Sequence, residues 1–462
     1  MRREEEEHVA QLQKSVGARG GFRYDPASMQ IRCEKRVLDN GLAVLVHEDH
    51  SCPIVAVNLW YHVGSKNERP GRTGLAHLFE HLMFEGSEHH DRGYFQPLQG
   101  AGAVLNGSTS ADRTNYWEVV PTGAVELAFW LESDRMGYLL PALTEAKFAN
   151  QRDVVLNERR QNYENRPYGR ASMALLAALY PPDHPYHWPT IGSAEDLRAT
   201  TLDEVRAFFA RHYHPGNASL AVAGAIAPAQ AFELASRYFG ELPPGPPRDP
   251  VILPPFTPST RRLVIEDRVE LPRLYLAWHS PRMFAPGDAE LDLVADLLAS
   301  GKTSRLYRHL VYERRVATEV AAFQQSREAA GFFQIVATAA PGHTLDELES
   351  AITAEFARLA DEGPSADELA RVLAQAEAQF VYRLQTVGGF GGKSDQLNAY
   401  NVFLGDPDFF PRDLERYLSV TTTAAGAAAA QYLQSAPRVS LSVVPEGREP
   451  LALADSDRAV VH

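Results

Sequence analysis

A proline-rich stretch in the middle of the chain separates two halves of similar pattern. It runs Glu241-Leu-Pro-Pro-Gly-Pro-Pro-Arg-Asp-Pro250 and continues with further prolines to Pro258. Proline lacks a backbone N–H and fixes its φ angle, so this density of prolines stiffens the chain in an extended form. We expect a linker over residues 241–260. A chain of 462 residues suits two domains, because single hydrophobic cores stop growing near ~250–300 residues.

The order of expected elements is similar on the two sides of this linker. Before it, strand patterns lie at 42–47, 54–62, 103–106, 114–120 and 218–224. Helical periodicity in that half lies near 122–138, 144–164, 169–180, 202–213 and 227–239. After the linker, strands are expected at 261–269, 273–279 and 439–444, with a helix at 287–299. Because strands and helices do not alternate strictly, the pattern favours an α+β fold over a doubly wound sheet.

This repetition indicates an internal duplication. We expect two homologous domains of the α/β-sandwich type, over residues 31–240 and 261–450. A polar N-terminal extension is expected over residues 1–30 and a tail over residues 451–462.

The segment from Gly74 to Gly86 in the first half carries a candidate metal motif. Its apolar residues recur at helical spacing: Leu75, Leu78, Phe79, Leu82 and Met83. On such a helix His77, Glu80 and His81 share one face. The pattern H-x-x-E-H is that of the inverted zinc peptidases, with two histidine ligands and a glutamate base. The helix expected at 287–299 contains no histidine, so only the first half can hold this metal.

A catalytic zinc usually takes three protein ligands and leaves its fourth position to water. The third ligand should be a carboxylate or an imidazole from another helix. Glu158 lies in the helical stretch 144–164, and helical spacing places Gln151, Val154 and Val155 on the same side of it.

From about Lys35 onward the chain resembles the M16 metallopeptidases, the family of pitrilysin and the mitochondrial processing peptidase. In that family the ligand glutamate follows H-x-x-E-H after some 76 residues, and the same number lies between His81 and Glu158. The resemblance implies that His77, His81 and Glu158 bind one Zn²⁺ and that Glu80 acts as the general base. It also implies that the two domains face each other as half of a clamshell.

Two further segments extend the resemblance. Asn106-Gly-Ser-Thr-Ser-Ala-Asp-Arg-Thr-Asn-Tyr116 is similar to the family's N-A-x-T-x-x-D-x-T-x-Y segment, an edge strand that pairs with extended substrate. The resemblance places Asn106 and Thr109 beside the substrate. Gln151 stands where the family often has a glutamate that supports the zinc site. Glutamine can form hydrogen bonds but brings no charge, so we expect tuned rather than abolished activity.

The largest departure from the family pattern lies in the second half. Self-sufficient members carry an Arg and a Tyr, seven residues apart, which contact substrate and stabilise the developing oxyanion. Here these positions hold Val311 and Thr318. In the split branch of the family, a homologous partner subunit supplies the pair.

The resemblance therefore implies the zinc-bearing catalytic subunit of a heterodimeric endopeptidase that cleaves peptides or unfolded segments. A self-sufficient homodimeric peptidase and a non-catalytic assembly subunit remain as alternatives.

Composition limits other functions. The net charge of −14 and the lack of a basic stripe argue against a nucleic-acid partner. Cys33 and Cys52 are expected to be free thiols. No apolar run reaches the ~18 residues of a membrane span, and the acidic N-terminus lacks the apolar core of a secretory signal. We expect a cytoplasmic protein, or a periplasmic one if a leader has been removed.

Other conspicuous residues are given structural roles. The histidines outside the motif lie in apparent turns or helix ends and are expected at the surface or as caps: His89, His90, His184, His187, His212 and His214. The segment Gly388–Gly392 lacks the Lys-Ser/Thr of a phosphate loop, so we expect a hinge or a helix break there.

Overall fold

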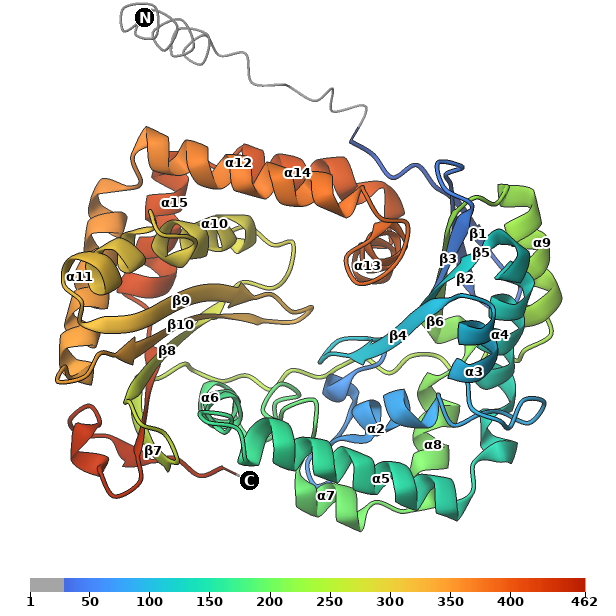
Figure 1. The fold of residues 1–462 in the computed structure, drawn as a ribbon, viewed down its shortest axis with the longest axis horizontal. Helices are drawn as coiled ribbons and strands as arrows, with labels where there is room; N and C mark the ends of the chain where they lie inside the picture. The colour runs from blue at the N-terminus through green and yellow to red at the C-terminus, as the bar shows by residue number, and fades with distance from the viewer. Residues whose placement is uncertain (1–28, 462) are drawn as a thin grey trace, which may run out of the picture.

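The computed structural model describes residues 29–461, and each half of the chain forms a six-stranded sheet (Figure 1). The extension expected over residues 1–30 lies almost wholly outside the described residues. Within residues 29–461, no helix combines the length and apolar character that crossing a membrane requires.

The first sheet has the order β1-β2-β6-β3-β5-β4. Only the β2–β6 pair is parallel. The central strands β3 and β6 are apolar and buried along nearly their whole length, because elements cover both faces of the sheet. The strands are β1 (Glu34–Val37), β2 (Ala43–Glu48), β3 (Ile54–Tyr61), β4 (Val104–Thr109), β5 (Thr114–Pro121) and β6 (Ala218–Gly224).

The second sheet repeats this topology with the order β12-β7-β11-β8-β10-β9. Its β7–β11 pair is parallel like β2–β6, and the pairs from β11 to β9 are antiparallel. Only the outermost strands differ, since β1 is antiparallel to β2 whereas β12 is parallel to β7. The strands are β7 (Arg261–Asp267), β8 (Arg273–Ser280), β9 (Ala317–Gln325), β10 (Gly331–Ala339), β11 (Arg438–Pro445) and β12 (Asp457–Arg458). The predicted α+β class with two related domains is confirmed.

Helices of the first half form a shared core with one face of its sheet. The stretch predicted at 144–164 is an α-helix to Arg159, followed by a π-helical turn over Arg160–Glu164. The helices are α2 (Leu75–Leu82), α3 (Phe95–Gly100), α4 (Val125–Ala142), α5 (Glu145–Arg159), α6 (Ala171–Leu179), α7 (Ala194–Ala199), α8 (Leu202–His212) and α9 (Pro228–Phe239).

The second half forms its own core between its sheet and helices. It contains β9 and β10, which the sequence patterns do not predict; β9 is an edge strand with polar residues facing outward, which hides its strand character. The helices are α10 (Asp288–Ala299), α11 (Leu345–Glu362), α12 (Ala366–Arg383), α13 (Lys393–Leu404), α14 (Phe410–Leu418) and α15 (Thr422–Ala429).

The two halves exchange one helix each. α6 of the first half packs on β8 and β11 of the second sheet, and α13 of the second half packs on β3 and β6 of the first (Figure 1). Asp395 of α13 accepts hydrogen bonds from Trp60 Nε1 at 3.0 Å and from Asn115 Nδ2 at 3.3 Å. Residues 241–260, which contain neither helix nor strand, connect the halves.

Candidate metal centre

Helix α2 is fixed by its apolar face. Its buried residues include Leu75, Leu78, Phe79 and Leu82. The Phe79 ring stacks on Phe208 of α8 with 5.7 Å between centroids. Rotation of α2 would expose this face to water, so the opposite face, which carries His77 and His81, is held against α5.

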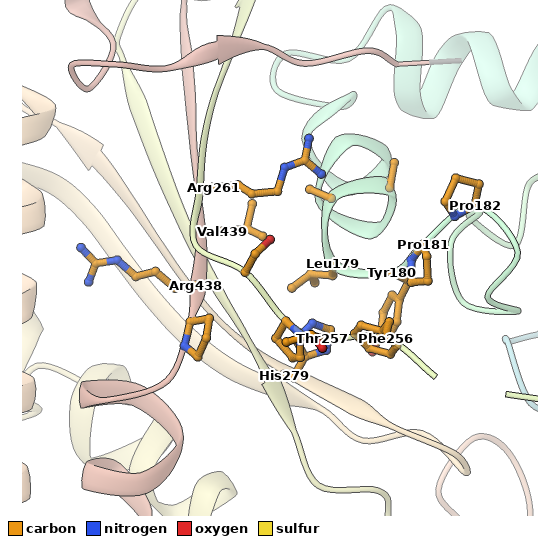
Figure 2. Close-up of a pocket in the computed structure, with 15 residues that line it drawn as sticks. Leu179, Tyr180, Pro181, Pro182, Phe256, Thr257, Arg261, His279, Arg438 and Val439 are labelled. Atoms are coloured by element: carbon orange, nitrogen blue, oxygen red, sulfur yellow. The ribbon is translucent and has the colours of Figure 1, made fainter. Parts of the chain in front are cut away.

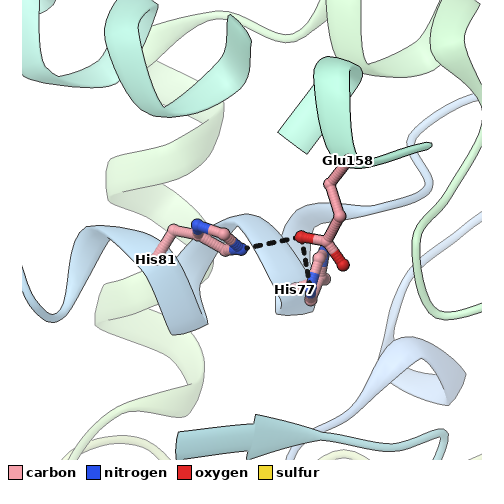
Figure 3. A group of neighbouring side chains, drawn as sticks. All are labelled: His77, His81 and Glu158. Atoms are coloured by element: carbon pink, nitrogen blue, oxygen red, sulfur yellow. Dashed lines mark ion pairs between the residues drawn. The ribbon is translucent and has the colours of Figure 1, made fainter. Parts of the chain in front are cut away.

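The structure brings the three expected metal ligands together (Figure 3). Glu158 Oε2 lies 3.7 Å from His77 Nε2 and 3.4 Å from His81 Nε2. One ligand atom from each residue lies within 4.8 Å of the others. With zinc–ligand bonds of about 2.0–2.1 Å, a tetrahedral centre separates its ligand atoms by about 3.4 Å. The two imidazoles and the carboxylate therefore fit a zinc ion whose fourth position stays open.

Burial and hydrogen bonding leave His77 and Glu158 in the protonation states that bind a cation. Desolvation lowers the pKa of His77 to about 4, and His81 adds to the effect, so the His77 imidazole is neutral at neutral pH and can donate a lone pair. The hydrogen bond from His81 lowers the pKa of Glu158, which keeps this carboxylate ionised. The Glu158 side chain is 34% exposed, which leaves one side of the group open to water.

Glu80 lies on the same helix face but outside the ligand group. Burial raises its pKa, while the Thr109 hydroxyl, His81 and Arg113 oppose the increase. Thr109 Oγ1 has no hydrogen-bond partner among the described residues. Thr109 therefore lowers the pKa of Glu80 as a nearby polar group rather than through a formed hydrogen bond. A partly desolvated carboxylate next to the metal ligands suits a general base.

Arg113 is a functional candidate that the sequence analysis missed. Its Nη1 donates to the backbone oxygen of Ser108 at 2.8 Å, and its guanidinium lies 5.0 Å from the centroid of Trp60. Its positive charge lowers the pKa of Glu80. No local pattern predicts this proximity, because it depends on how the hairpin packs beside α2.

The two expected substrate contacts lie on different faces of β4, the edge strand of the first sheet. Thr109 is near Glu80. Asn106 is exposed, and its Oδ1 accepts a hydrogen bond from the Gly107 backbone N–H at 2.8 Å. The outer edge of β4 has no partner strand in the described part of the chain.

Gln151 lies on α5 two turns before Glu158. Its Nε2 donates a hydrogen bond to Glu85 Oε1, in the segment after α2, rather than to a metal ligand. The contact links the two ligand-bearing segments, and the supporting role expected for Gln151 stays a prediction.

The positions expected for an Arg/Tyr pair offer neither a cation nor a phenol. Val311 packs against the core of the second half. Thr318 Oγ1 donates to the backbone oxygen of Thr338 at 3.4 Å.

The second-half counterpart of α2 lacks the two histidines and the glutamate of the H-x-x-E-H motif. α10 begins after Gly287 with φ of 93°, as α2 begins after Gly74 with φ of 91°. With these glycines aligned, Glu290 replaces His77 and Val294 replaces His81. Among the described residues, only His77, His81 and Glu158 form a possible metal-binding group.

A separate cavity of about 290 Å³ lies between α6, the linker and the second sheet (Figure 2). Tyr180, Phe256 and His279 line it, and none of the metal ligands does. His184 stacks on Tyr180 with 4.5 Å between centroids and is buried, as is His214. Neither histidine lies at the surface. Aromatic rings enclose His184, whereas His214 Nε2 lies 3.2 Å from the backbone oxygen of Arg211 in the last turn of α8, a capping contact of the expected kind. Cys33 and Cys52 are free thiols.

Two related α+β domains, with a histidine–histidine–glutamate group on the first alone, match a known class of metallopeptidase folds. Residues 43–185 match the family model described as "Insulinase (Peptidase family M16)", and residues 199–376 match the model "Peptidase M16 inactive domain". The chain belongs to the M16 peptidase family.

Similar proteins include enzymes named zinc proteases. The zinc protease PqqE of Helicobacter pylori is 28% identical over 382 residues, which cover 81% of this chain and 85% of the relative. A probable mitochondrial-processing peptidase subunit beta of Arabidopsis thaliana is 26% identical over 351 residues, covering 71% of this chain and 64% of that protein. The crystal structure of a protease from Helicobacter pylori has a TM-score of 0.83 and 26% identity, covering 90% of this chain and 100% of that one.

Proposed function

We propose that this chain is a zinc endopeptidase and the catalytic subunit of a two-subunit M16 enzyme. The observation that carries the proposal is the convergence of His77, His81 and Glu158 at distances of 3.4 and 3.7 Å, with Glu80 on the same helix face. Relatives named zinc proteases support the same chemistry.

Each group has a definite task in peptide hydrolysis. Zinc, when bound, supplies a Lewis acid that lowers the pKa of water and polarises a peptide carbonyl. Glu80 accepts the proton of the attacking water and delivers it to the leaving amine. The free edge of β4 pairs with the substrate backbone by β-augmentation, and Asn106 lies along that edge. Because such pairing needs an extended backbone, peptides and unfolded segments are the expected substrates.

The second half does not complete this centre. A cation or phenol that stabilises the oxyanion contributes a large part of the rate in acyl transfer, and Val311 and Thr318 supply neither. A homologous M16 subunit that carries an Arg/Tyr pair would provide them. The name of the Arabidopsis relative, a subunit of a processing peptidase, is consistent with a multi-subunit enzyme.

Metal analysis and hydrolysis of fluorogenic peptides test the proposal. The purified chain should bind one zinc and cleave peptides only after addition of a homologous M16 subunit from the same organism. Full activity of the chain alone would contradict the split enzyme and favour a homodimeric peptidase. A chain that binds no zinc would contradict the peptidase and leave a non-catalytic assembly role.

A further inference from the structure

We propose that Arg159 and Gly192 are positioning residues that hold the two ligand-bearing helices in register; this inference rests on the zinc site proposed above. The site needs such a device because its ligands come from separate elements. His77 lies in the first turn of α2, and Glu158 lies in the last turn of α5. The segment 191–193, here called the clasp, contacts both ends.

The clasp contacts the start of α2 through backbone and hydroxyl groups. The Ser193 backbone N–H donates to Thr73 Oγ1 at 2.9 Å. Gly192 has φ of 73°, and a Cβ atom there would lie 2.4 Å from both Cα and N of Gly74. Real Cβ atoms do not approach backbone atoms so closely, so any side chain at position 192 would displace α2 or the clasp.

The same segment is held to the end of α5 by a buried cation. Arg159 follows the ligand Glu158 directly and is 4% exposed. Its Nη1 donates to the backbone oxygen of Gly192 at 3.1 Å. Its Nε forms an ion pair with Glu164 Oε1 at 3.2 Å, which balances the buried charge. A charge-assisted hydrogen bond of this kind is stronger and more directional than a neutral one.

The chain of contacts therefore runs from Glu158 through Arg159 and Gly192 to Gly74, three residues before His77. Removal of a group that orients a metal ligand typically lowers metal affinity about 10–100-fold. A small displacement of α2 relative to α5 would widen the 3.4 and 3.7 Å ligand separations. Metal affinity should then fall even where the fold persists.

Two pairs of matched variants test this coupling. Arg159→Met removes the donor to Gly192, and Arg160→Met serves as its control. The side chain of the exposed Arg160 donates to Leu156 and Asn157 of α5, and among the described residues it has no bond to the clasp. Gly192→Ala introduces the clash, and Gly71→Ala is its control, since Gly71 has a similar φ of 77° and a Cβ atom there would meet no other atom within 4 Å. Zinc affinity is measured by competition with a chelator, and stability of the metal-free protein by urea unfolding.

Arg159→Met and Gly192→Ala should each weaken zinc binding by about tenfold or more, beyond any loss of stability, while both controls bind as the wild type does. The cobalt-substituted variants should also show altered visible absorption, which reports ligand geometry rather than stability. Arg159→Lys keeps a cationic donor but not the planar fork that contacts both Gly192 and Glu164, so it should bind zinc more tightly than Arg159→Met and less tightly than the wild type.

These measurements distinguish failure of the proposed zinc site from failure of the clasp. A wild-type chain that binds no zinc overturns the proposed site itself. A wild type that binds zinc, with folded Arg159→Met or Gly192→Ala of unchanged affinity and cobalt spectrum, overturns the clasp alone. If either of these variants fails to fold, Arg159→Lys decides, and wild-type affinity together with an unaltered cobalt spectrum in that variant contradicts the inference.

Discussion

Burial sets the charge of the residues around the metal centre. Desolvation keeps His77 neutral, whereas the hydrogen bond from His81 keeps Glu158 ionised. Desolvation of Glu80 raises its pKa toward the range in which a carboxylate exchanges protons effectively. Glu80 and Glu158 are the same residue type, so the different roles proposed for them, base and ligand, depend on their surroundings.

Replacing Glu80 with glutamine should separate metal binding from catalysis. Glu80→Gln should retain one zinc per chain, because Glu80 is outside the ligand group, and should lower kcat about 10²–10⁴-fold through loss of proton transfer. Metal analysis and fluorogenic peptide assays of the complete enzyme measure the two effects. Glu88→Gln, at an exposed position, is the control. Turnover at the wild-type rate in Glu80→Gln would contradict the assigned base.

Site residues could be predicted from the sequence when they lie close together along the chain, and not when they meet only through folding. His77, Glu80 and His81 required only helical geometry within one turn. Glu158 could be proposed from helical spacing and paired with them only through the family pattern. The contact of Arg159 with Gly192 joins residues 33 positions apart, and no periodicity or motif signals such a bond.

At the scale of elements, the exchange of α6 and α13 determines how the sheets are covered. The segment Gly388–Gly392, expected to be a hinge or helix break, leads directly into α13. A Cβ at Gly388 would lie 2.6 Å from the side chains of Ala56 on β3 and Val119 on β5. Glycine is needed there because the loop lies directly on the sheet. The helices themselves were visible as apolar periodicity, but docking across halves depends on complementary surfaces that a linear pattern does not record.

A methyl group at position 388 should loosen the docking of α13. Gly388→Ala should destabilise the protein by about 1–3 kcal/mol through overpacking, with faster amide exchange in α13 than in the wild type. Gly123→Ala, where a Cβ atom would have no neighbour within 4 Å, should change stability by less than about 0.5 kcal/mol. Urea unfolding and hydrogen exchange provide the measurements. Equal exchange in α13 for both variants would contradict the role of this contact.

At the scale of the whole molecule, a charged cluster joins the β9–β10 turn to the first half. His62 Nε2 lies 2.7 Å from Glu328 Oε2, and Lys66 pairs with the same carboxylate. The Glu328 backbone N–H donates to Asp112 Oδ2 at 3.0 Å. The duplication was recognisable from the order of strands around the linker, whereas this junction was not, because β9 and β10 were not predicted.

The cluster makes the junction sensitive to acid. Burial alone would raise the pKa of Glu328, but the hydrogen bond from His62 and the charge of Lys66 outweigh it and lower the pKa to about 2. An unfolded glutamate titrates near ~4.3. The stabilisation that ionised Glu328 gives the folded protein is therefore fully present above about pH 4.3 and is lost as the pH falls toward 2. Between pH 6 and pH 3, Tm should fall more steeply for the wild type than for Glu328→Gln; parallel profiles would contradict the linkage.

Anomalous diffraction at the zinc absorption edge shows whether His77, His81 and Glu158 hold the proposed catalytic zinc ion. Crystals of the purified chain should show one anomalous peak, about 2.0–2.2 Å from His77 Nε2, His81 Nε2 and a Glu158 carboxylate oxygen. A zinc-supplemented crystal with no peak at this position, or with its peak at other residues, would contradict the proposed zinc site.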